Sequence, residues 1–155
     1  VVAGVIESAG EFKDGKLSEA KFNEPTSLVI DSKGNLYVSD TGNQAIRYID
    51  FTNNVVTTVA GKVTLGNKLY ADPGYQDGAA LEAKFASPRG LALTNEGGLL
   101  IADSANHTIR YLLDGKVTTI IEGLRFPTDV GNTSDGSIVV VDSYNNQIIK
   151  INKKY

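Results

Sequence analysis

Three aspartates recur along the chain in nearly the same local sequence, and each is followed three residues later by an asparagine. The pairs are Asp40 with Asn43, Asp103 with Asn106, and Asp142 with Asn145. Three equivalent carboxylates could bind a metal ion or act as general bases. One copy in every repeat instead favours a structural role, in which the side chains accept amide hydrogens and order a turn. We therefore expect six structural turn residues, with no metal site and no catalytic residue among them.

His107 is the only histidine of the chain, and it could serve as a general base near neutral pH. The residues at the equivalent repeat positions are Gln44 and Asn146, which favours a turn histidine. With one His and no Cys, neither a multi-histidine nor a thiolate metal centre can form within one chain. No Ser/His/Asp arrangement and no phosphate-binding glycine loop is found. We keep His107 as a candidate binding residue and expect no cofactor.

Two arginines, Arg47 and Arg110, are each followed by a tyrosine. Interleaved arginine and aromatic residues can bind nucleic acid by stacking. However, the chain has 18 acidic and 15 basic residues, a net charge of −3 and a pI near 5.1, so a nucleic-acid partner is not expected. The arginines are predicted to pack between repeats and to pair with carboxylates or backbone groups.

Residues 62–77 form the one irregular segment that the repeats do not share equally. They contain aromatic and polar side chains suited to a peptide or a glycan, with Pro73 and Gly74 forcing a turn. The candidate binding residues are Tyr70, Asp72, Tyr75, Gln76 and Asp77. Because loops on a rigid scaffold often carry function, this segment is the candidate binding loop. A variable loop with no ligand is the alternative.

Composition and length predict one globular domain. The chain has 155 residues, of which 41% are apolar and 21% charged. No stretch approaches the roughly 18 to 20 apolar residues of a membrane span. The first residue is Val1, so we expect a processed product or a piece of a longer protein. Together with abundant Asn and Thr and absent Cys, this favours a secreted or cell-surface protein.

The elements that carry these residues come from an internal repeat. AKFNEP at residues 20–25 returns as AKFASP at residues 83–88, with a reduced form, LRFP, at residues 124–127. LYVSD at residues 36–40 likewise matches LLIAD and IVVVD, which end at Asp103 and Asp142. The unit is about 40 residues long, and one insertion lengthens the first interval. This period is typical of the four-stranded blade of a β-propeller.

Each unit is predicted to hold four short strands separated by polar turns. The predicted ranges are about 22–61 for blade 1, 85–123 for blade 2 and 126–152 for blade 3, with the insertion at 62–77. Gly131 and Asn132 are expected to interrupt the first strand of blade 3, which also lacks a fourth strand. Residues 1–4, VVAG, match the strand end TVAG at residues 58–61. We expect residues 1–4 to complete the third blade of a partner or neighbour.

The combination of AG, DG, AxFxxP, YVSD, Asp-x-x-Asn and IRY resembles the NHL repeat family of β-propellers over nearly the whole chain. The resemblance implies an all-β fold of four-stranded antiparallel blades. Ile149 departs from it, at the position held by Arg47 and Arg110. NHL-type propellers include protein-interaction scaffolds, RNA-binding surfaces, a lyase and relatives similar to hydrolases, so the fold does not fix the function. The lyase relatives use several histidines to bind metal, and this chain has one.

Two functions therefore remain open. The favoured one is a non-enzymatic binding or scaffold module that binds a protein, peptide or glycan through its loop face. The alternative is a small propeller hydrolase or lyase, with carboxylates and His107 around the central channel.

The blade count predicts a partner. Propellers close with about 4 to 8 blades, so three blades leave two open flanks. Two chains would supply six blades, which predicts a homodimer in which residues 1–3 of each chain complete the third blade of the other. The rival partner is the other half of a cleaved propeller, with a different sequence.

Overall fold

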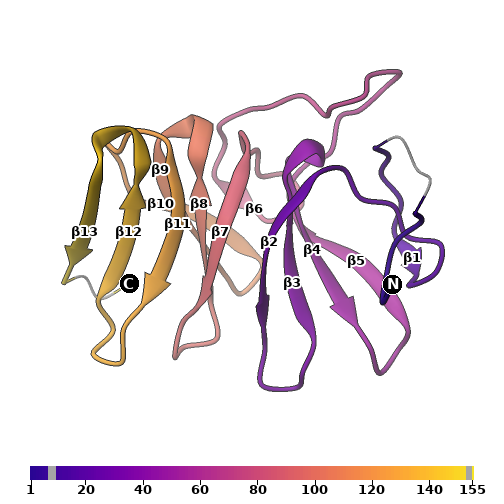
Figure 1. The fold of residues 1–155 in the computed structure, drawn as a ribbon, viewed down its shortest axis with the longest axis horizontal. Helices are drawn as coiled ribbons and strands as arrows, with labels where there is room; N and C mark the ends of the chain where they lie inside the picture. The colour runs from indigo at the N-terminus through magenta and orange to yellow at the C-terminus, as the bar shows by residue number, and fades with distance from the viewer. Residues whose placement is uncertain (7–9, 153–154) are drawn as a thin grey trace.

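The chain folds into three antiparallel sheets that stand side by side as the blades of a propeller (Figure 1). The computed structural model describes residues 1–6, 10–152 and 155. The predicted all-β class, with three antiparallel blades in the chain, is confirmed. No helix of the described part is long and apolar enough to cross a membrane.

Short hairpins build each blade outward from an innermost strand that begins at a proline. Blade 1 contains β2 (Pro25–Ile30), β3 (Leu36–Asp40), β4 (Ala45–Asp50) and β5 (Val55–Ala60). Blade 2 contains β7 (Pro88–Leu93), β8 (Leu99–Asp103), β9 (Thr108–Leu113) and β10 (Lys116–Ile121). Blade 3 contains β11 (Pro127–Asn132), β12 (Ile138–Asp142) and β13 (Gln147–Ile151). Among the described residues, β13 is thus the outermost strand of the third sheet.

The predicted interruption of the innermost strand of blade 3 is wrong. Strand β11 continues to its end, where Gly131 pairs with Val139 and Asn132 pairs with Ile138. A glycine in a strand removes a side chain but leaves the backbone N–H and C=O free to form the ladder. The irregularity of β11 lies instead between Pro127 and Asp129, where the register shifts.

Blades 1 and 2 each carry a fifth strand that the repeat did not predict. Strand β1 (Gly15–Lys16) pairs with β5, and β6 (Gly78–Ala79) pairs with β10. Both begin at a glycine with a φ above 120°, a conformation that a residue with a Cβ rarely adopts. The DG pair at the start of each repeat therefore covers the outer edge of its own blade.

A single turn of 3₁₀ helix joins the second and third strands of every blade. These turns are η1 (Thr41–Asn43), η2 (Ser104–Asn106) and η3 (Ser143–Asn145). The residue after each turn is left-handed, with φ between 54° and 60°, and it is Gln44, His107 or Asn146. The three turns and residues 62–77 lie at the same end of the blades, called here the loop face (Figure 1).

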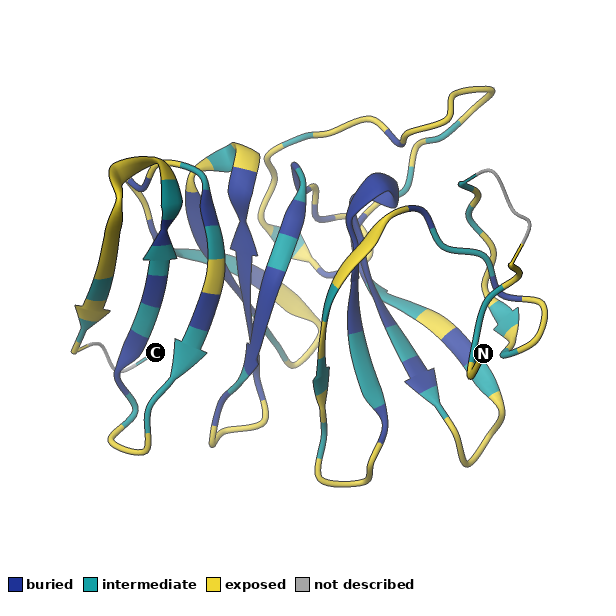
Figure 2. Cartoon of the chain, viewed as in Figure 1, coloured by how far each residue is buried: buried dark blue, intermediate teal, exposed yellow. Residues whose placement is uncertain are grey.

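The hydrophobic core lies between blades. Between blades 1 and 2, Ile46 packs in one cluster with Phe85 and Leu91. Between blades 2 and 3, Ile109 packs with Val130. Figure 2 shows the buried residues on the strands between neighbouring blades, whereas β13 at one flank is largely exposed. A third cluster, around Val38 and Val56, lies in blade 1. Apolar burial between the blades therefore adds to that within a blade in stabilising the fold.

Candidate functional site

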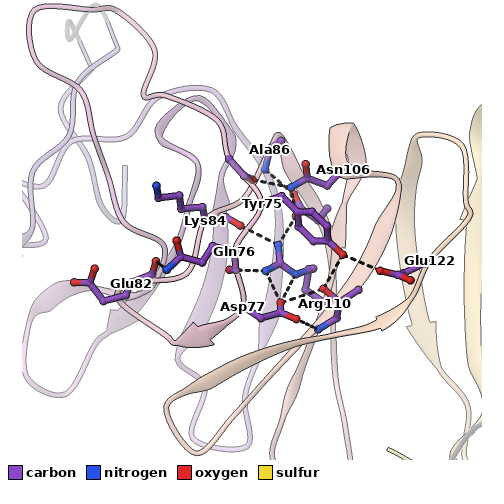
Figure 3. A network of polar contacts seen from close by, with 12 residues as sticks. Tyr75, Gln76, Asp77, Glu82, Lys84, Ala86, Asn106, Arg110 and Glu122 are labelled. Carbon is purple, nitrogen blue, oxygen red and sulfur yellow. Dashed lines mark hydrogen bonds and ion pairs between the residues drawn. The ribbon is translucent and has the colours of Figure 1, made fainter.

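A fully buried arginine lies at the centre of blades 1 and 2. Figure 3 shows the cluster of blade 2, in which Arg110 donates to Asp77, to Asp103 at 2.7 Å and to the backbone oxygens of Gln76 and Lys84. These contacts use all five N–H groups of the guanidinium.

Arg47 repeats this pattern in blade 1. It donates to Asp14, Asp40 and the backbone oxygens of Lys13 and Lys21. The predicted pairing of both arginines with carboxylates and backbone is therefore observed, but within a blade rather than between blades. Neither guanidinium retains an N–H for nucleic acid or another ligand.

Two aromatic rings lie close to each buried guanidinium. The Arg110 Cζ lies 5.1 Å from the ring centroid of Tyr75 and 5.0 Å from that of Phe85. In blade 1, Phe12 and Phe22 take these places around Arg47. The Tyr75 ring thus covers an internal cation, while its hydroxyl donates to Glu122 at 3.0 Å.

The repeated aspartates join loops inside the blades. Asp103 accepts hydrogen bonds from the Ala86 N–H and the Asn106 side chain, both at 2.8 Å, as well as from Arg110. Asp40 repeats this pattern in blade 1. Burial raises the pKa of both carboxyls above the ordinary value, against the lowering effect of their hydrogen-bond donors. Both side chains are fully buried, so neither faces a ligand surface.

Asp142 keeps part of this arrangement in blade 3. It accepts from the Arg125 N–H at 2.6 Å and from Asn145 at 2.7 Å. Ile149 stands where the other blades have arginine, so this carboxylate lacks the ion pair. Two hydrogen bonds of the aspartate therefore recur in all three blades. It accepts one from the asparagine side chain three residues later and one from the backbone N–H 17 residues earlier.

His107 connects blades 2 and 3 at the loop face. Its Nδ1 accepts a hydrogen bond from the Phe126 N–H at 3.0 Å. Gln44 does the same one blade earlier, where its side-chain oxygen accepts from the Ser87 N–H at 2.7 Å. Both residues are left-handed, and each side chain accepts a hydrogen bond from the N–H just before the next blade's first strand. His107 therefore makes the same contact between blades as Gln44, although its ring remains exposed.

Residues 62–77 are fastened to both neighbouring blades. Asn23 donates to the Leu69 oxygen, and the Ala71 N–H donates to the Gly42 oxygen in η1. On the other side, the Gly74 N–H donates to the Phe85 oxygen. Hydrogen bonds therefore fix the candidate loop at blade 1 and at blade 2.

The predicted binding residues of this loop fall into two groups. Tyr75, Gln76 and Asp77 belong to the Arg110 cluster, in which desolvation of Asp77 is outweighed by donors from Thr119 and Arg110, so its pKa lies below the ordinary value. Tyr70 and Asp72 lie on the exposed crest, where they contact Glu24 and Lys68. Ligand binding by these residues stays a prediction.

Sequence reasoning missed a pocket between the three innermost strands. This axial pocket, of about 190 Å³, is lined by the two residues that follow each starting proline, namely Thr26, Ser27, Arg89, Gly90, Thr128 and Asp129. Aligning the three repeats draws attention to positions with the same residue in each repeat. At the position after the proline, however, blade 2 has Arg89 where blades 1 and 3 have Thr26 and Thr128. That divergence is the signal that could have found the pocket.

Arg89 is the cationic side chain of this pocket, which the exposed carboxylate of Asp129 also lines. The Arg89 Nε is buried, and within the described part of the chain it has no hydrogen-bond partner. The guanidinium carbon lies 5.5 Å from the Phe126 ring centroid, and that ring stacks on Tyr144 at 4.8 Å. A buried donor without an acceptor is costly, and a carboxylate is a strong acceptor for a guanidinium. The described residues contain no group of three or more His, Cys, Asp or Glu that could hold a metal ion.

Comparison with known proteins identifies the repeat that blades 1 and 2 share. The model of the NHL repeat matches residues 22–47 and 85–110, which contain the buried arginine and its aspartate in blades 1 and 2. The chain belongs to the NHL-repeat family. The third NHL-like unit lies outside the two matched segments and has Ile149 in place of the arginine.

Longer proteins carry the similar sequences. This NHL-repeat chain is 30% identical over 115 residues to NHL repeat-containing protein 2 of Bos taurus, covering 72% of the chain and 15% of that protein. It is 28% identical over 156 residues to the protein SUPPRESSOR OF QUENCHING 1, chloroplastic, of Arabidopsis thaliana, covering 91% of the chain and 14% of that protein. The chain therefore spans only a small part of each relative's length.

Solved structures share the fold. An auxiliary nutrient binding protein from Bacteroides thetaiotaomicron superposes with a TM-score of 0.68 at 15% identity, over 86% of this chain and 38% of that one. A chain of a nidogen/laminin complex superposes with a TM-score of 0.62 at 20% identity, over 84% of this chain and 43% of that one. At these identities, the likeness establishes the propeller fold of the NHL-repeat chain.

Proposed function

We propose that this chain is a non-enzymatic binding module, and that its ligand carries a carboxylate which Arg89 binds at the loop-face end of the axial pocket. The observation that carries the proposal is the buried Nε of Arg89, which has no partner among the described residues. The stacked rings of Phe126 and Tyr144 beside it offer an apolar surface to the rest of the ligand. Acidic peptides and uronate-containing glycans both have this chemistry.

The binding function is favoured over a hydrolase or lyase because the repeated carboxylates are not available for chemistry. Asp40 and Asp103 are buried in ion pairs, and His107 accepts a backbone N–H through Nδ1. A general base must reach the proton that it removes. Proteins of similar fold named for nutrient binding, and for a complex between nidogen and laminin, are consistent with a binding role.

The proposal is tested by titrating the chain with two small molecules that differ in a carboxylate. Glucuronate should shift the NMR signal of the Arg89 Nε–H saturably, with a Kd on the order of millimolar for so small a probe, and glucose should not. Arg89→Gln should abolish this binding. Arg125→Gln, which removes an exposed arginine of blade 3, is the matched control and should leave it unchanged. An equal response to both sugars, or none to glucuronate, would overturn the proposal.

A further inference from the structure

The axial pocket receives a different polar side chain from each blade. Strand β7 lies between β2 and β11, so that Ser27, Arg89 and Asp129 line one space (Figure 1). These residues supply a hydroxyl, a cation and an anion respectively. The Ser27 hydroxyl has no hydrogen-bond partner in the described part of the chain. The pocket therefore offers both signs of charge to one small ligand.

The two threonines of the pocket are committed to the turns of the loop face. The Thr26 hydroxyl lies 2.7 Å from that of Thr41, which itself donates to the Pro88 oxygen at 2.7 Å. Thr26 is therefore the donor to Thr41, and its proton is not available to a ligand. The Thr128 hydroxyl pairs in the same way with that of Ser143. The polar character of the pocket thus depends mainly on its two charged residues.

The carboxylate of Asp129 is held against the backbone of β7. A Cβ at Gly90 would overlap the Asp129 Oδ1, so the absence of a side chain at this position makes room for the carboxylate. The same Oδ1 accepts the Val130 N–H at 2.9 Å. Among the described residues, Oδ2 has no hydrogen-bond partner. Since Gly90 directly follows Arg89, the anion lies beside the strand position next to the cation.

These opposite charges do not neutralise each other. Within residues 1–6, 10–152 and 155, Arg89 and Asp129 form no ion pair with each other or with another side chain. A carboxylate bound to Arg89 alone would bring a second negative charge close to Asp129, and like charges at short range repel. A ligand that also carries a cation would remove this repulsion and would give Oδ2 a donor. Charge balance therefore favours a ligand with both groups.

The size of the pocket limits the ligand. Its volume is about 190 Å³, below the roughly 300 to 1,000 Å³ of pockets that hold drug-sized molecules. A free amino acid combines small size with a carboxylate and an ammonium group separated by one or two carbons. A uronate, or the side chain of an acidic residue inside a peptide, has the carboxylate without a neighbouring ammonium.

We propose that the ligand of the axial pocket is a free amino acid bound as a zwitterion, with its carboxylate on Arg89 and its ammonium on Oδ2 of Asp129. This inference rests on the proposed function and narrows it to one class of carboxylate. Arg89 supplies affinity for every carboxylate, whereas Asp129 discriminates against those that lack a cation. Ser27 adds a neutral hydroxyl, which can accept from the ammonium or donate to the carboxylate.

Propionate, alanine and β-alanine test the contribution of the ammonium. The three probes share a carboxylate on a three-carbon skeleton, and the last two add an amine at the second or the third carbon. In titrations that follow the NMR signal of the Arg89 Nε–H near neutral pH, the better of the two amino acids should bind at least about tenfold more tightly than propionate. Equal affinities for all three probes would overturn the proposal.

Asp129→Asn tests the place of the ammonium. Asparagine keeps an oxygen for the Val130 N–H, so the local backbone contact is retained. The variant should bind propionate more tightly than the wild type does and the amino acid more weakly, so that the tenfold preference disappears. Asp114→Asn, which removes an exposed carboxylate from the turn between β9 and β10, is the matched control and should keep the preference. A preference that survives Asp129→Asn would contradict the assignment of the ammonium to Asp129.

The same titrations distinguish failure of this inference from failure of the proposed function. If Arg89→Gln abolishes the binding of propionate but the amine adds no affinity, Arg89 binds carboxylates and the amino acid is the wrong ligand. If neither glucuronate nor any of the three probes binds in an Arg89-dependent way, both proposals are wrong.

Discussion

At the residue scale, Asp103 and Asp142 hold equivalent places in successive blades but differ in one partner. Both accept an asparagine side chain and a backbone N–H, and only Asp103 also accepts from a fully buried arginine. A buried charge that loses its partner costs far more than a neutral hydrogen bond. Comparing substitutions at Asp103 and Asp142 therefore separates the contribution of the ion pair with arginine from that of the hydrogen bonds to the asparagine and the backbone.

We predict that Asp103→Asn lowers the free energy of unfolding by about 3 to 5 kcal/mol, because it leaves Arg110 with a single carboxylate in a buried site. Asp142→Asn should cost only about 1 kcal/mol, since it removes hydrogen-bond strength without stranding a charge. Urea denaturation of both variants checks this difference. Equal losses in the two variants would show that the buried arginine contributes little.

Tyr48 gives a prediction about pH. Its hydroxyl donates to Asp31 at 2.7 Å, and desolvation, followed by that hydrogen bond, raises its pKa to about 12. A raised folded pKa means a stabilisation that is complete below the unfolded value of about 10 and is lost as the pH rises through 12. The bond from Tyr48 lowers the pKa of Asp31, so that group's contribution is lost as the pH falls below about 4.

The stability difference between the wild type and Tyr48→Phe should therefore be largest between about pH 5 and 10 and should shrink on both sides. Urea denaturation across the pH range measures it, and the difference in tyrosinate absorbance between the wild type and Tyr48→Phe follows the ionisation of Tyr48. Tyr144→Phe, at a phenol that is 61% exposed, controls for loss of a hydroxyl as such. A difference that stays constant up to pH 12 would contradict the role of the bond to Asp31.

The residues that the sequence could assign are those whose role repeats. Arg47 and Arg110 were assigned to pairing with carboxylates or backbone because the acidic net charge and the repeat both opposed a ligand role, and they are so paired. The repeat pattern does not indicate a role for Arg89, because this residue follows Pro88 at a position where the other repeats have threonine. Its importance depends on a buried Nε without a partner, which only the packing of the three innermost strands reveals.

At the element scale, the close approach of β7 and β11 depends on one glycine. A Cβ at Gly90 would overlap the Cα of Asp129 and lie 3.0 Å from the Thr128 oxygen, so the backbone of one strand would have to move. At Gly131, in the same strand as Asp129, a Cβ would meet no heavy atom within 4 Å. These two glycines therefore form a matched pair that differs in the distance to the neighbouring strand.

We predict that Gly90→Ala lowers the free energy of unfolding by about 1 to 3 kcal/mol through overpacking. Gly131→Ala should be neutral or stabilise by about 0.5 kcal/mol, because alanine reduces the backbone entropy of the unfolded chain. Thermal denaturation of the two variants provides the comparison. Equal midpoints for both variants would show that blades 2 and 3 can separate without cost.

The main strands were predictable because turn residues and apolar runs agree in all three repeats. The short strands β1 and β6 were not, because two residues carry no periodicity. They form where Asp14 and Asp77 bind backbone N–H groups of the outer strands, at Thr58 and Thr119. Such a contact joins positions more than 40 residues apart and leaves no local pattern in the sequence.

At the scale of the whole molecule, the apolar clusters that join blade 1 to blade 2 and blade 2 to blade 3 make the stability of each blade depend on its neighbour. We predict that Ile109→Ala, at a side chain that is 0% exposed and packs with Val130 of blade 3, lowers the free energy of unfolding by about 2 to 5 kcal/mol. Leu81→Ala, at a residue that is 57% exposed, is the control and should change the free energy of unfolding by less than about 0.5 kcal/mol. Urea denaturation measures both variants, and equal losses would show that the cluster between blades 2 and 3 adds no stability.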